Sequence, residues 1–242
     1  MIDLGQATNL AELLEAVRSA GNRFADRQLW CRGHASKDWK LIPSAHRYDP
    51  VLESLMANHF RLRAPALRRD CPAHSEYLAW LPLMRHYGLP TRLLDWTESI
   101  CVAAFFATKH KPKPGPSVVW MLSPGHLNHY SIGDIVPFLH DNRVKPIAEA
   151  AFSRLDAPHT VAAMAPRHDA RMAAQLGNFT VHGSREPLEE HTNAANFLAK
   201  IEIPKSAQDR VNYDLVSAGM RLSNLFPDLD HLAEELSELC VI

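Results

Sequence analysis

Apolar residues recur at helical spacing near the start of the chain. Between residues 9 and 20 they fall on one face, and this pattern predicts a helix. Asn9 is the expected N-cap, with Glu12 three residues later, and Gly21 is the expected terminator. The same spacing predicts further helices over residues 51–67, 75–85, 99–108 and 230–239 and one capped by Ser206 that runs to Met220.

Other segments carry the pattern of strands. Short apolar runs at residues 28–33 and 117–122 indicate buried strands, and period-2 alternation at residues 178–182 and 198–203 indicates two more. A loop is expected over residues 86–97, a proline-rich break over 111–116, and short helices interrupted by prolines over 123–170. Helices and strands mixed in this way predict an α+β fold in a single domain.

Composition narrows the class of protein. The 242 residues, 46% apolar, are enough to bury a sizeable core. A net charge of −1 provides no global basic field, so binding of nucleic acid would need a local patch. The four cysteines stand far apart, which argues against a disulfide framework and a zinc ribbon. No run of eighteen apolar residues and no basic leader occur, so we expect a cytoplasmic protein without a membrane partner.

Searches for metal and nucleophile motifs return little. His126 and His129 have i,i+3 spacing but lack an acidic or cysteine companion, so no metal site is predicted. The chain also lacks the glycine-rich phosphate loops and the Gly-x-Ser-x-Gly elbow, which removes support for kinase, Rossmann and hydrolase functions.

Polar residues gather in a segment between two apolar helices, residues 85–97. Because loops on a rigid scaffold often carry function, this segment is a candidate site. The alternative is a packed turn in which Asp95 caps the following helix or pairs with Arg92.

Three further segments have both a functional and a structural interpretation. Arg32 ends a predicted strand, where its guanidinium suits a phosphate or forms a salt bridge, and Gly33 lets a ligand or another backbone approach. Ser44 and Arg47 repeat the pairing of a hydroxyl with an arginine, although a helix start explains them equally well. Gln175, just before a strand, either binds a ligand hydroxyl or braces backbone.

Taken in order, these motifs resemble those of the FRG domain family. The resemblance spans about residues 25–230 and implies that the whole chain, residues 1–242, is a single FRG domain. Here Cys31 stands where the family name records phenylalanine. The motifs are Cys31-Arg32-Gly33, Trp39-Lys-Leu-Ile-Pro-Ser44-Ala-His-Arg47, His86-Tyr-Gly-Leu-Pro-Thr-Arg-Leu-Leu-Asp-Trp-Thr97, Ala103-Ala-Phe-Phe-Ala107, Arg171-x-x-x-Gln175-x-Gly177-x-Phe179 and Leu225-Phe-Pro-Asp228.

A weaker resemblance is to ADP-ribosyltransferases of the Arg-Ser-Glu type. It implies a split-sheet core with flanking helices and NAD as the substrate. By this resemblance Arg32 grips the diphosphate, Thr97 takes the serine position, and Gln175 falls in the last motif. The other residues implied in NAD binding are Gly33, Ser44, Arg47, His86, Tyr87, Arg92 and Asp95.

The resemblance implies transfer of ADP-ribose to a nucleic-acid or protein acceptor, or hydrolysis of NAD, in stress, phage defence or as a toxin. Breaking the nicotinamide–ribose bond develops an oxocarbenium ion, which a carboxylate stabilises. Here the last motif reads Gln175-Leu-Gly177 and lacks the usual glutamate. The alternatives are therefore a catalytically silent module that binds a nucleotide or nucleic acid, and a purely structural scaffold. For a binding site, we expect one positively charged pocket lined by Arg32, Arg47, His86, Arg92, Asp95, Thr97 and Gln175.

Overall fold

The protein is described here from a computed structural model, which covers residues 1–108, 113–155, 157–166 and 170–239. Within these ranges the strands are β1 (Ile2–Gln6), β2 (Trp30–His34), β3 (Leu93–Thr97), β4 (Ser117–Leu122), β5 (Thr160–Ala163), β6 (Gly177–His182) and β7 (Leu198–Ile203). The helices are α1 (Leu10–Phe24), α2 (Pro50–Leu67), α3 (Tyr77–His86), α4 (Ile100–Thr108), α5 (Pro124–His129), α6 (Lys145–Ser153), α7 (Ala170–Ala174), α8 (Gln208–Ser217), α9 (Leu222–Leu225) and α10 (Leu229–Leu239). Short 3-10 turns occupy Ser44–Arg47, Leu188–Glu190, Ala194–Asn196 and Lys205–Ala207.

The strands form one mixed sheet in the order β1-β7-β4-β2-β3-β6-β5. Neighbours are antiparallel, apart from the parallel pair β1 and β7. The pairing of β2 with β3 rests on one residue pair, Cys31 opposite Thr97, whereas β2 and β4 pair along all of β2. The sheet is therefore weakly joined at its centre, and the predicted α+β class is confirmed.

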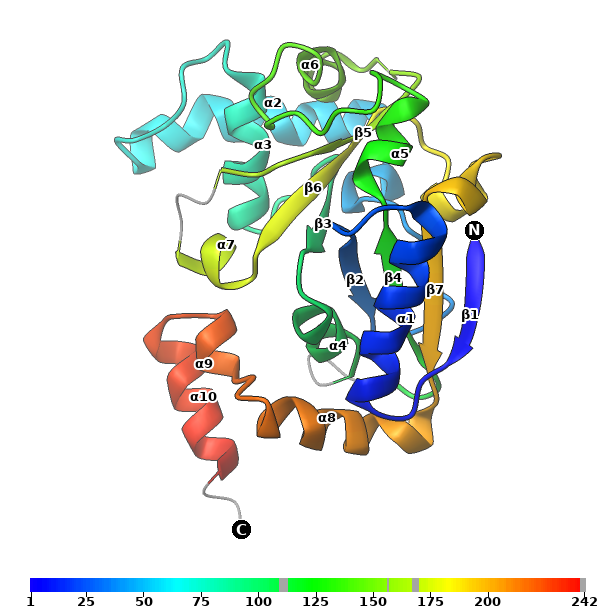
Figure 1. The fold of residues 1–242 in the computed structure, drawn as a ribbon. Coiled ribbons are helices and arrows are strands. Elements are labelled where there is room, and N and C mark those ends of the chain that lie inside the picture. Colours follow the sequence, from blue (N-terminus) through cyan, green and yellow to red (C-terminus); the bar gives the residue numbers. More distant parts are fainter. Residues whose placement is uncertain (109–112, 156, 167–169, 240–242) are drawn as a thin grey trace.

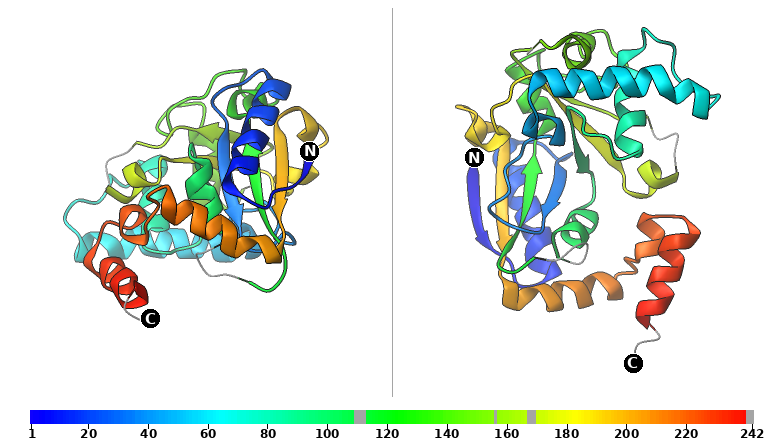
Figure 2. Two further views of the ribbon diagram at one scale, coloured as in Figure 1. Left: turned by 60° about the horizontal axis from the view of Figure 1, so that its bottom comes forward. Right: turned by 180° about the vertical axis from the view of Figure 1, so that it is seen from behind.

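Helices cover the two halves of the sheet separately (Figures 1 and 2). Helices α1, α4 and α8 pack on β2, β4 and β7, in a core that includes Cys31. Helices α2, α3 and α6 pack on β3, β5 and β6, in a core that includes Leu93. Because Cys31 is opposite Thr97, and Thr97 shares a face of β3 with Leu93, both cores lie on the same face of the sheet. A third core, rich in tryptophan, covers the opposite face.

Most of the predicted helices and strands are confirmed within a few residues. Asn9 caps α1 by accepting a hydrogen bond from the backbone N–H of Glu12. Gly21 does not end this helix, which continues to Phe24 and stops at Ala25 in the left-handed conformation. A Cβ at Gly21 would lie 2.8 Å from the carbonyl oxygen of Asp26, so glycine is needed there for the close return of the chain.

Two local predictions are wrong, and two strands were missed. Residues 93–97 form β3, a central strand, and not the second half of a loop. Both faces of β3 are covered and only Asp95 is less than fully buried, so its polar residues Asp95 and Thr97 do not mark a solvent face and look like loop residues in the sequence. The predicted Ser206 cap lies in a 3-10 turn, and α8 begins at Gln208 without a side-chain cap. Strand β1 was not predicted, and β5 lies within residues 123–170, where only short helices were expected.

Two further expectations concern the proline-rich break and the absence of a membrane-spanning helix. Residues 109–112, which include part of the predicted proline-rich break, lie outside the described residues. No helix in the described ranges is long and apolar enough to span a membrane.

Candidate functional site

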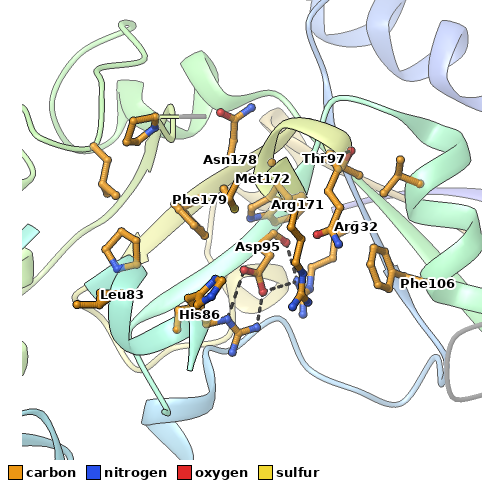
Figure 3. Close-up of a pocket in the computed structure, with 18 of the residues that line it drawn as sticks. Arg32, Leu83, His86, Asp95, Thr97, Phe106, Arg171, Met172, Asn178 and Phe179 are labelled. Atoms are coloured by element: carbon orange, nitrogen blue, oxygen red, sulfur yellow. Dashed lines mark hydrogen bonds and ion pairs between the residues drawn. The ribbon is translucent and has the colours of Figure 1, made fainter. Parts of the chain in front are cut away.

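A pocket of about 1330 Å³ opens where the two halves of the sheet meet. Its lining comes from β2, β3 and β6 and from helices α3, α4 and α7 (Figure 3). The pocket therefore lies between α4, which covers one half of the sheet, and α3, which covers the other. Pockets for small molecules usually measure about 300–1,000 Å³, and this one has room for an extended ligand.

Five of the seven residues expected to share a pocket line this one: Arg32, His86, Asp95, Thr97 and Gln175. They come from β2, α3, β3 and the turn before β6, so the fold brings together segments far apart in sequence. Arg47 and Arg92 do not line it, and that part of the expectation is wrong.

Arg32 is held by two neutral acceptors. Its Nε donates to Nε2 of His34 at 2.9 Å, and its Nη1 donates to the backbone oxygen of Asp95 at 2.6 Å. This backbone oxygen is accessible because β2 and β3 separate beyond Cys31. Burial lowers the pKa of the Arg32 guanidinium to about 10, so it keeps its charge at neutral pH.

The carboxylate of Asp95 pairs chiefly with Arg85. Arg85 binds both carboxylate oxygens, whereas Nη1 of Arg32 lies 3.7 Å from the nearer one. Burial by itself raises the pKa of Asp95, but Arg85 and Arg32 outweigh burial and hold this pKa below its usual value. The alternative in which Asp95 pairs with Arg92 is therefore wrong. Arg85 begins the candidate segment 85–97 but was given no role of its own in the site.

Thr97 and Gln175 are in direct contact. The hydroxyl of Thr97 donates to the backbone oxygen of Gln175 at 2.7 Å and accepts from the backbone N–H of Ser99 at 3.1 Å. The amide of Gln175 donates to the backbone oxygen of Leu225 at 3.0 Å, so it braces backbone, as one interpretation of the sequence expected. Among the described residues, Oε1 of Gln175 has no hydrogen-bond partner, which leaves this acceptor for a ligand.

The pocket lining is positively charged. Arg32 and three arginines that were not predicted in the site, Arg68, Arg85 and Arg171, face two aspartates, Asp70 and Asp95. The guanidinium of Arg171 lies 4.5 Å from the ring centroid of Phe226, a cation–π contact that joins α7 to the C-terminal segment.

An apolar half completes the pocket. Its walls include Leu83 of α3 and Phe179 of β6, which Figure 3 labels, and Phe138 also lines the pocket. The ring of Phe138 stacks on His140, with centroids 5.6 Å apart. The pocket thus offers charged groups at one end and apolar and aromatic surface at the other.

Close packing of the backbone explains why position 33 is a glycine. A Cβ there would lie 1.9 Å from the backbone oxygen of Ala103, so glycine allows α4 to pack against β2. Of the two interpretations of this glycine, the approach of another backbone is the one that the structure contains.

The remaining predicted residues lie outside the pocket lining. Arg92 is fully buried and binds both carboxylate oxygens of Glu53, at 2.6 and 3.0 Å. Ser44 and Arg47 bound a 3-10 turn, as the structural interpretation allowed. The phenol oxygen of Tyr87 accepts a hydrogen bond from Arg68 at the surface.

In the part of the chain that the structure describes, no group of three or more histidine, cysteine, aspartate or glutamate side chains is placed to hold a metal ion. The cysteines at positions 31, 71 and 101 are free thiols. Burial raises the pKa of the Cys31 thiol to about 12, so this pocket residue is not a thiolate nucleophile.

Comparison with known protein families gives a match over part of the chain. The family model of the FRG domain matches residues 27–115. No curated protein matches the chain. No solved structure matches it either. The matched region includes Arg32-Gly33 and the segment from His86 to Thr97, whereas the motifs around Gln175 and Leu225 lie beyond it, so the extension of the domain to residue 230 stays a prediction. The resemblance to the FRG domain family is therefore confirmed as a match of the family model over residues 27–115.

Proposed function

We propose that the pocket binds NAD and that the protein transfers ADP-ribose from it to a macromolecular acceptor or to water. The observation that carries this proposal is the convergence of Arg32, Thr97 and Gln175, from three separate segments, on one arginine-rich cavity. These are the residues at which the weaker resemblance implies diphosphate binding and catalysis.

The two ends of the pocket suit the two kinds of chemistry in a dinucleotide. The arginines suit a diphosphate, because a guanidinium forms charge-assisted hydrogen bonds with phosphate oxygens. The apolar end suits a planar base, which gains from burial and from stacking on aromatic rings. A volume of about 1330 Å³ accommodates both groups at once.

The reaction breaks the bond between C1′ of the ribose and the nicotinamide nitrogen, and the electron pair leaves with nicotinamide. An acceptor nucleophile then attacks C1′ and loses its proton to solvent. In this scheme Oε1 of Gln175 accepts a hydrogen bond from a ribose hydroxyl, and Thr97 holds the backbone at Gln175 through its 2.7 Å hydrogen bond. Holding the reacting groups in a fixed orientation can remove a large part of the activation free energy of such reactions.

A second candidate function is a catalytically silent nucleotide-binding module. The acids among the described lining residues are Asp70 and Asp95, and no glutamate is among them. Asp95 is already paired with Arg85, so its charge is less available to an oxocarbenium ion. This observation favours binding without turnover.

Release of nicotinamide from NAD, followed by chromatography with nucleic-acid and protein acceptors present, separates the two functions. For an enzyme we expect release by the wild-type protein and its loss in Gln175→Ala, with little change in Gln28→Ala, a surface glutamine. Gln175→Glu raises hydrolysis if charge stabilisation limits the rate. Saturable binding of NAD without release in any of these proteins favours the silent module, and release that neither Gln175 variant alters contradicts the assigned role.

A further inference from the structure

His34 lies two residues after Arg32 on β2, so both side chains point to the same face of the strand. It is 4% exposed, and its ring packs edge-on against Trp39 and Trp120, at centroid distances of 6.0 and 6.5 Å. These contacts leave the imidazole little freedom to move.

The hydrogen bonds of His34 determine which ring nitrogen carries the proton. The Nε–H of Arg32 can only donate, so Nε2 of His34 must be the acceptor at 2.9 Å. The proton then resides on Nδ1, which donates to the backbone oxygen of Trp39 at 3.2 Å. Burial and the neighbouring Arg32 lower the pKa of His34 to about 3, which agrees with a neutral ring.

Both groups that accept hydrogen bonds from Arg32 are therefore uncharged. One is the imidazole of His34, and the other is the backbone oxygen of Asp95. The Asp95 carboxylate is hydrogen-bonded by Arg85 and forms only a longer ion pair with Arg32, at 3.7 Å. Within the described residues, Nη2 of Arg32 makes no hydrogen bond, and Arg32 lines the pocket. A carboxylate at position 34 would orient the guanidinium equally well, but it would also neutralise much of its attraction for an anion.

We propose that His34 is a positioning residue: its neutral ring fixes the Arg32 guanidinium so that the Nη2 edge meets the phosphate groups of the ligand. This role rests on the proposed function of the pocket. His34 contributes by keeping Arg32 ordered before binding, because ordering a long side chain upon binding costs affinity.

The test compares His34→Phe, which keeps the ring packing but removes the acceptor, with His34→Gln, whose amide oxygen can replace Nε2. Without ligand, the NMR signal of the Arg32 Nε–H should exchange slowly with water in the wild-type protein and in His34→Gln, and fast in His34→Phe. Equal exchange in all three proteins would overturn the contact on which the proposal depends.

Calorimetric titration with ADP-ribose then measures the consequence. We expect His34→Phe to weaken binding about 2- to 12-fold, the range for ordering one side chain, and His34→Gln to restore most of this loss. In an Arg32→Lys background, His34→Phe should have no further effect, whereas a role in packing alone would persist there. Unchanged affinity in His34→Phe overturns the positioning role. Failure of the wild-type protein to bind ADP-ribose overturns the proposed function instead, while the exchange experiment still decides the contact.

Discussion

Arg32 and Arg92 belong to the same set of motifs, yet the fold places them in opposite circumstances. Arg92 is fully buried and shares two hydrogen bonds with the carboxylate of Glu53, which joins α2 to β3. Arg32 donates hydrogen bonds to two neutral acceptors, lies 3.7 Å from a carboxylate that Arg85 binds more closely, and lines the pocket. An arginine whose charge is matched internally holds the structure together, whereas one held by neutral groups keeps its charge for a ligand.

This difference extends to the neighbours of each arginine. Glu53 also lies 3.6 Å from Arg185, so two arginines surround one buried carboxylate. Around the pocket, Asp95 is the counter-charge for Arg85 and, at 3.7 Å, for Arg32, and its side chain is 41% exposed. The region around Arg92 therefore depends on ion pairs for its stability. The region around the pocket depends on them much less.

The largest expected effect is on stability at Arg92. Arg92→Met removes one partner of a buried pair, so we expect the free energy of unfolding to fall by about 3–5 kcal/mol. Urea denaturation measures this change. In Arg32→Met the loss should be clearly smaller, and equal losses at the two positions would contradict the comparison.

The second prediction concerns the loss of folding stability at acidic pH through His34. The unfolded chain protonates His34 near pH 6.5, whereas the folded chain does so only near pH 3, because burial and Arg32 disfavour the charged ring. The protein should therefore be fully stable with respect to this group above about pH 6.5 and lose about 2 kcal/mol by pH 5. Denaturation curves at pH 7 and pH 5 measure this loss, which His34→Gln should remove. A wild-type curve without this loss would mean that His34 is not a buried neutral acceptor.

A smaller effect is expected at the joint between the half-sheets. Thr97→Val deletes the hydroxyl that donates to Gln175 and accepts from Ser99, so unfolding should become easier by about 1 kcal/mol. Thermal unfolding measures this change, and Thr91→Val, at a buried threonine outside the pocket lining, is the control. If Thr97→Val lowers nicotinamide release no more than this control does, Thr97 does not position Gln175.

Much of the fold could be predicted from the sequence because most helices and strands have a one-sided apolar pattern. Helix α1 is an example, with its Asn9 cap and amphipathic face. Strand β3 was not predicted, because it is only five residues long and its polar residues Asp95 and Thr97 look like part of the preceding loop, although the strand is covered on both faces.

Some residues of the candidate site were predicted from the sequence, and others were not, because their contacts come from distant parts of the chain. Sequence motifs identify which arginines matter but not what each one contacts. Glu53, the partner of Arg92, lies 39 positions away on another element. Arg171 was part of a quoted motif, yet its place in the lining follows from its packing on Phe226, which only the folded chain brings near.

The central claim is that the charge of Arg32 serves a ligand. Titration calorimetry of ADP-ribose into the wild-type protein, Arg32→Lys and Arg47→Lys tests it most directly, because Arg47 lies outside the pocket lining. The account predicts that Arg32→Lys loses bidentate geometry and about 1–3 kcal/mol of binding free energy, while Arg47→Lys binds like the wild-type protein. Unchanged affinity in Arg32→Lys, or an equal loss in both variants, would contradict it.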